Sequence, residues 1–138
     1  MIDKVVLLDK AITLSEVYGN NLDTVVYTQG CGLSARLRLE KLGFNTEGKT
    51  FAISTYEDLK NNRISNESKN WRNDNRAGLI WLDDLYELNN DENFIYPLID
   101  QANLFIEQSI LDPNIQVEDQ FFVSAIMGRA YKYTQDLK

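Results

Sequence analysis

One stretch of the sequence has the residue types and spacing of a phosphate-binding motif. Residues 43–50 are GFNTEGKT, which matches the P-loop pattern G-x-x-x-x-G-K-[ST]. In a P-loop, backbone amides surround the phosphates, the lysine contacts the β and γ groups, and the threonine holds magnesium. Gly43, Gly48, Lys49 and Thr50 would do this chemistry here. Nucleotide binding is therefore one of the functions to be weighed.

The residues around this motif favour a different structure. A P-loop follows a buried strand and opens a helix. Residues 36–42 carry four charges, which does not suit a buried parallel strand, and residues 50–54 are themselves typical of a strand. The Asn45–Gly48 segment is typical of a hairpin turn. We therefore predict a turn between two strands at the motif.

A second candidate site is a group of acidic residues. Residues 77–128 contain ten acids and no lysine or arginine. Apolar residues at helical spacing run through this stretch, so we expect folded helices with unpaired carboxylates on their outer faces. The most closely spaced acids are Asp83, Asp84, Glu87, Asp91 and Glu92. Such carboxylates can bind Mg²⁺ or act as acid and base, but no lysine is near them, and we predict no metal site.

The sequence contains no histidine, which excludes imidazole catalysis and histidine-ligated zinc. The one cysteine, Cys31, lies between two glycines in a predicted turn, with no base near it in sequence. No catalytic residue and no cofactor is predicted, and the sequence leans against an enzyme.

Residues 60–76 form a basic, asparagine-rich segment around Trp71, and we predict a long surface loop there. Its candidate binding residues are Trp71, Arg72 and Arg76. Aromatic and basic residues together can bind single-stranded nucleic acid, but the net charge of −7 makes nucleic acid an unlikely partner. This loop could instead contact the acidic stretch of another copy.

The elements that would position these residues suggest an α+β fold in a single domain, residues 1–138. A helix is predicted at 3–18 and a strand at 23–28. Residues 33–43 fit either a strand or a helix, and we favour a strand because apolar and polar residues alternate. With residues 50–54 this gives a small three-stranded antiparallel sheet. A short helix near Thr55 and a C-terminal group of three helices, at 78–89, 95–111 and 117–134, complete the prediction.

These features favour a small acidic protein that occupies a basic surface on a protein partner, as inhibitors, immunity proteins and other antagonists do. One alternative is a self-assembling subunit, such as a phage virion component, and another is nucleotide binding through GFNTEGKT. No apolar run is long enough to cross a membrane, and the N-terminus lacks a signal-peptide pattern, so we expect a cytoplasmic location.

Overall fold

The computed structural model describes residues 3–18, 27–61, 63, 77–109 and 117–135. Within these ranges every regular element is a helix. The elements are α1 (Lys4–Val17), α2 (Tyr27–Lys41), α3 (Gly48–Lys60), η1 (Gly78–Ile80), α5 (Trp81–Asn89), η2 (Glu92–Phe94), α6 (Tyr96–Ser109) and α7 (Val117–Thr134). The α-helices predicted at 3–18, 95–111 and 117–134 correspond to α1, α6 and α7, and that at 78–89 corresponds to η1 and α5.

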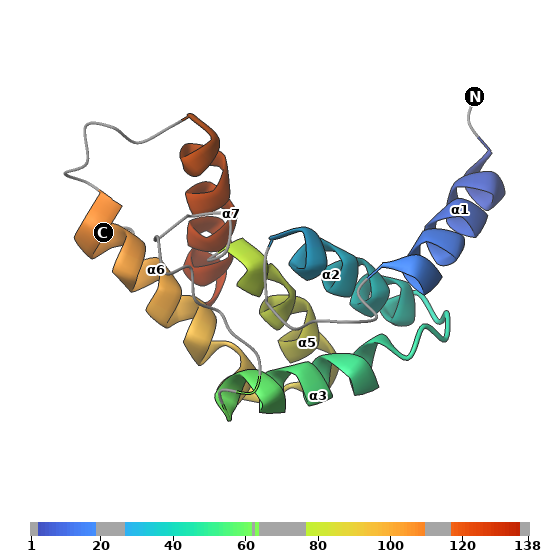
Figure 1. Cartoon of the computed structure of the whole chain (residues 1–138), viewed down its shortest axis with the longest axis horizontal. Helices are drawn as coiled ribbons and strands as arrows, with labels where there is room; N and C mark the ends of the chain where they lie inside the picture. Colours follow the sequence, from blue (N-terminus) through green and yellow to red (C-terminus); the bar gives the residue numbers. More distant parts are fainter. Residues whose placement is uncertain (1–2, 19–26, 62, 64–76, 110–116, 136–138) are drawn as a thin grey trace.

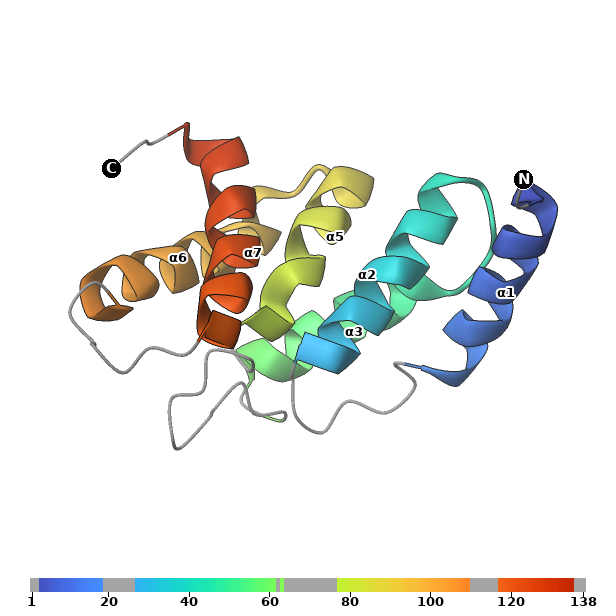
Figure 2. The ribbon, with the colours of Figure 1, turned by 90° about the horizontal axis from the view of Figure 1, so that it is seen from above.

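The helices follow one another along the long axis of the molecule (Figures 1 and 2). α6 and α7 pack together at one end, α5 and α2 lie side by side in the middle, and α1 is outermost at the other end. α3 packs against both α2 and α5. None of the described helices is both long and apolar enough to cross a membrane.

The predicted three-stranded antiparallel sheet is wrong, and with it the α+β class. Residues 33–40 lie in α2 and residues 50–54 lie in α3, while most of the predicted strand 23–28 falls outside the described residues. The misleading alternation in α2 has a physical cause. Leu33 and Leu37 are buried in the core, whereas Leu39 lines the contact with α1. A helix between two neighbours has two apolar faces, and their residues combined resemble the alternation of a strand.

The two predicted turns are also wrong. One lies within a helix, and the other connects two helices instead of two strands. Gly30 and Cys31 lie within α2, where a Cβ on Gly30 would come within 2.2 Å of the Gly78 carbonyl oxygen. Gly30 therefore permits the close approach of α2 and η1 and does not form a turn. The predicted hairpin at Asn45–Gly48 is the connection between α2 and α3, with Glu47 in the left-handed region at φ 52°. α3 already begins at Gly48, before the helix start expected near Thr55.

α5 is the central helix of the molecule. Residues 77–85 are buried without interruption, and Trp81, Leu82 and Leu85 are fully inaccessible to solvent. They form the core with Leu33 and Leu37 of α2 and with apolar residues of α3, η2, α6 and α7. Because α5 is enclosed on several sides, its polar residues near the N-terminus are buried as well. α1 contributes no residue to this core.

Candidate functional site

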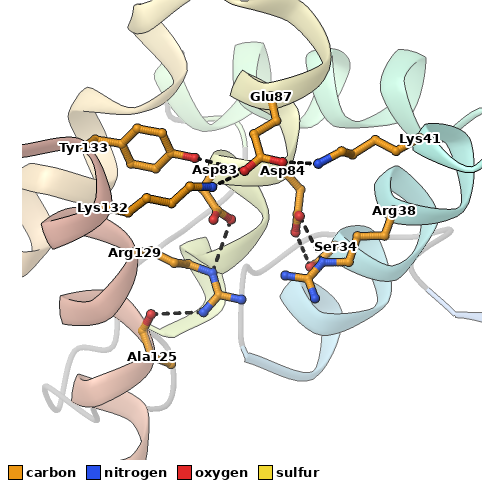
Figure 3. Close-up of polar contacts among 10 residues, drawn as sticks. All are labelled: Ser34, Arg38, Lys41, Asp83, Asp84, Glu87, Ala125, Arg129, Lys132 and Tyr133. Atoms are coloured by element: carbon orange, nitrogen blue, oxygen red, sulfur yellow. Dashed lines mark hydrogen bonds and ion pairs between the residues drawn. The ribbon is translucent and has the colours of Figure 1, made fainter.

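Two of the three acidic residues of α5 lie inside the protein. Asp83 is 6% exposed and Asp84 is 3% exposed. Glu87, one turn further along, lies at the edge of the same contact between helices. The expectation of unpaired carboxylates on an outer face is therefore wrong for these three residues, since basic side chains of α2 and α7 surround them (Figure 3).

Asp84 connects α5 to α2. Its Oδ1 accepts a hydrogen bond of 2.9 Å from Arg38 Nε, and its Oδ2 accepts one from the Ser34 hydroxyl. Ser34 is 5% exposed, so its hydroxyl depends on this carboxylate. The hydrogen bond to Asp84 also raises the pKa of Arg38, which fixes the guanidinium as a cation.

Asp83 points to the opposite neighbour, α7. Its Oδ1 accepts a hydrogen bond of 3.2 Å from Arg129 Nε, and Arg129 also donates to the Ala125 carbonyl over 3.0 Å. Burial raises the pKa of Asp83, and the adjacent Asp84 carboxylate raises it further, while the positive charge of Arg129 opposes both effects. The Asp83 carboxyl is therefore harder to ionise than a carboxyl in water.

Glu87 joins three helices. It accepts hydrogen bonds from Lys41 of α2 and from Lys132 of α7, and the Tyr133 hydroxyl donates to it over 3.4 Å. The bonds from Lys132 and Lys41 lower the pKa of Glu87 to about 2. The reciprocal bond raises the pKa of Lys132.

Together these side chains form an internal network that joins α2, α5 and α7. The three carboxylates point in different directions, each toward its own basic partners, and so do not converge on one point (Figure 3). No group of three or more ligating side chains suited to a metal ion occurs in the described residues. The arrangement is that of a structural polar contact.

The GFNTEGKT segment does not have the architecture of a P-loop. The element before Gly43 is the helix α2, where a P-loop has a strand. The Lys49 amide, at the start of α3, already donates to Glu40 Oε2 over 2.8 Å. A carboxylate of the chain itself therefore occupies the position where a phosphate would bind. Gly48 is accounted for by packing, since a Cβ there would lie 2.9 Å from Arg36 Cβ.

The candidate loop residues Trp71, Arg72 and Arg76 lie outside the described residues. Cys31 is an exposed free thiol on α2.

A second set of acids lies on the outside of the molecule. Asp91 and Glu92, near the start of α6, are exposed. They continue into a stripe on α6 whose members recur every three or four residues and are all exposed: Tyr96, Asp100, Asn103 and Glu107. No ion pair involving Asp91, Glu92, Asp100 or Glu107 occurs in the described parts of the chain. We call this surface the α6 acidic stripe.

A groove lies beside the α6 acidic stripe, between α6 and α7. Its volume is about 250 Å³. Its walls include Ile99 and Ile106 of α6 and Met127 and Tyr131 of α7. Asn103 belongs to both the groove and the stripe, so apolar and acidic surfaces are continuous there.

Sequence reasoning identified Asp91 and Glu92 but missed the rest of the stripe and all the partners in the internal network. Two signals point to those partners. The bases Arg38 and Lys41, and again Arg129 and Lys132, are three residues apart on helices, which places each pair on one face.

Comparison with protein-family models, with curated proteins and with solved structures finds no match to this chain. The function must therefore be inferred from the residues of this chain and their geometry.

Proposed function

We propose that this protein binds a basic segment of a protein partner through the α6 acidic stripe and the adjoining groove. The observation that carries the proposal is the contrast in pairing. The carboxylates of α5 are neutralised within the protein, whereas those of the stripe have no basic partner in the described residues. Charges left open to solvent on one face attract an opposite charge and accelerate association.

The geometry defines the chemistry of the partner. From Tyr96 to Glu107 the stripe spans about 16 Å at 1.5 Å per helical residue. An amphipathic helix of about three turns matches this length. Its lysine or arginine side chains would reach Asp100 and Glu107, and its apolar side chains would enter the groove beside Ile106 and Tyr131.

Tyr96 and Tyr131 strengthen this assignment. They are 52% and 44% exposed, one at the end of the stripe and the other on the wall of the groove. Tyrosine is enriched at protein interfaces because its ring buries apolar area while its hydroxyl stays hydrogen-bonded. We place this encounter in the cytoplasm, since Cys31 is an exposed free thiol and such thiols persist in reducing compartments.

The test is capture of partners from an extract of the native host by three tagged proteins. The first is the wild type and the second carries Asp100→Lys and Glu107→Lys. The third is a matched control with the same change in net charge on α3, Glu57→Lys and Asp58→Lys. We expect a basic protein to bind the wild type and the control at low salt and to be lost with the stripe variant.

Purified components then give the affinity. The stripe variant should bind the captured protein at least about tenfold more weakly, and a rise in salt should weaken the wild-type complex. Ile106→Asp, which places a charge in the groove, should act in the same direction. Equal loss in the control variant would show that net charge alone matters, and would contradict the proposal.

A further inference from the structure

Among the described residues, α1 and its C-cap carry six of the eleven large hydrophobic side chains that are exposed. These six side chains of α1 and its C-cap are between 52% and 72% exposed: Val5, Val6, Leu7, Leu14, Val17 and Tyr18. The only buried residue of the helix is Ser15. α1 is the outermost helix at its end of the molecule and packs against α2 (Figure 2). A helix normally buries its apolar face, so an exposed apolar surface of this size indicates a binding interface.

A groove of about 530 Å³ lies beside this helix, between α1 and α2. Its walls are mainly apolar and include Leu14 and Tyr18 of α1 and Ala35, Leu39 and Leu42 of α2. Leu42 is 70% exposed at the rim. The protein thus carries an apolar ridge and an apolar groove side by side.

We propose that this surface is the interface of a symmetric dimer, in which α1 of each copy lies in the groove between α1 and α2 of the other. A two-fold axis requires one patch to be complementary to itself. An apolar ridge next to an apolar groove meets this requirement, because the ridge of each copy can pack into the groove of the other.

The charges of the patch also favour a second copy. The whole chain carries a net charge of −7, so most pairs of like faces repel each other. The acids of α1 and its cap are Asp3, Asp9 and Glu16, and the bases are Lys4 and Lys10, whereas Arg38 on the groove wall is already paired with Asp84. The patch therefore carries only a small share of the negative charge of the chain, so two copies that meet on this face repel each other only weakly.

The available area fits a stable dimer. Six side chains of α1 and Leu42 expose roughly 500–700 Å² together, at about 100–200 Å² for a whole apolar or aromatic side chain. A standard interface buries about 800 Å² on each partner. The patch therefore supplies most of one side of such an interface, and the polar rim supplies the remainder.

Sedimentation equilibrium over about a hundredfold range of concentration tests the proposal, since a dimer forms by mass action. We expect the mass to rise from 15.9 kDa toward twice that value. Leu14→Asp should weaken the dimer at least about tenfold, because it would bury an unpaired charge. Phe121→Asp is the matched control, since Phe121 is 69% exposed on α7, and it should leave the dimer unchanged. Far-UV circular dichroism confirms that both variants fold.

Cys31 provides a second readout within the same groove. It is the one cysteine of the chain and lines the groove wall. Its reaction with a thiol reagent should slow as the protein dimerises, and Leu14→Asp should restore the fast rate. A monomer at all concentrations, or a dimer that Leu14→Asp leaves intact, would overturn the proposal. The proposal would also be overturned if Cys31 reacted slowly at concentrations where only the monomer is present, because other residues of the same chain would then cover the groove. Neither result bears on the α6 acidic stripe, which lies on a different face.

Discussion

The acidic residues of α5 and those of α6 come from one base-free stretch of sequence but have opposite environments. Asp83 and Asp84 are at most 6% exposed, and they and Glu87 are paired with bases from α2 and α7. Asp100 and Glu107 are exposed and have no basic partner among the described residues. Local sequence does not separate the two groups. What separates them is position in the fold, since α5 is enclosed by neighbours whereas α6 presents one face to solvent.

The largest expected difference between the two groups is in stability. Asp84→Ala should lower the free energy of unfolding by about 2 to 3 kcal/mol, because it leaves the buried Ser34 hydroxyl without its acceptor and Arg38 without its ion pair. Asp100→Ala should change it by less than about 0.5 kcal/mol, as an exposed site without partners. Urea denaturation of both variants measures this difference.

A double variant sharpens the result. Adding Ser34→Ala to Asp84→Ala removes the stranded hydroxyl, so part of the lost stability should return. Equal effects of Asp84→Ala and Asp100→Ala would mean that the α5 carboxylates are not held inside as described.

The sequence predicted much of the helical framework but not how the helices pack. The helices at 3–18, 95–111 and 117–134 were recognisable because apolar residues recur at helical spacing. α2 was not, because Leu33 and Leu39 serve two different neighbours and together resemble a strand. α3 was predicted to start late, since the β-branched and aromatic residues at 50–54 suggested a strand that tertiary packing overrides.

The site was predictable to a similar degree. Asp91 and Glu92 were identified from charge alone and are exposed as expected. The interior position of Asp83 and Asp84 was not foreseen, because their partners lie 46 to 50 positions away along the chain. Such pairing depends on which helices become neighbours, and a charge count along the sequence contains no such information.

A smaller effect is expected at Glu87, with a defined dependence on pH. The folded-state pKa of Glu87 is about 2 and lies below the ordinary value of 4.5. Its contribution to stability is therefore present above pH 4.5 and is lost as the pH falls through about 2. Glu87→Gln should cost about 1 kcal/mol at neutral pH, a modest value because solvent screens this partly exposed site.

Unfolding in urea at several pH values between neutral and acidic measures this cost. The difference between Glu87→Gln and the wild type should shrink as the pH falls below 4.5. A constant difference at every pH would show that packing of the side chain, and not its charge, stabilises the contact with Lys41 and Lys132.

The smallest expected effect on stability is at Asp83, and its dependence on pH is opposite to that at Glu87. Burial, with the adjacent Asp84, raises the pKa of Asp83 above its ordinary value of 3.8. The stabilisation that accompanies a raised pKa is present below pH 3.8 and is lost as the pH rises through the folded-state pKa. Asp83→Asn removes this ionisation and keeps an oxygen that can accept from Arg129. The variant should therefore gain relative to the wild type as the pH rises, and at neutral pH should differ from it by less than about 1 kcal/mol. A growing loss with rising pH would mean that Arg129 offsets the burial of Asp83 completely, as the two lysines do for Glu87, and the distinction between these two acids of α5 would disappear.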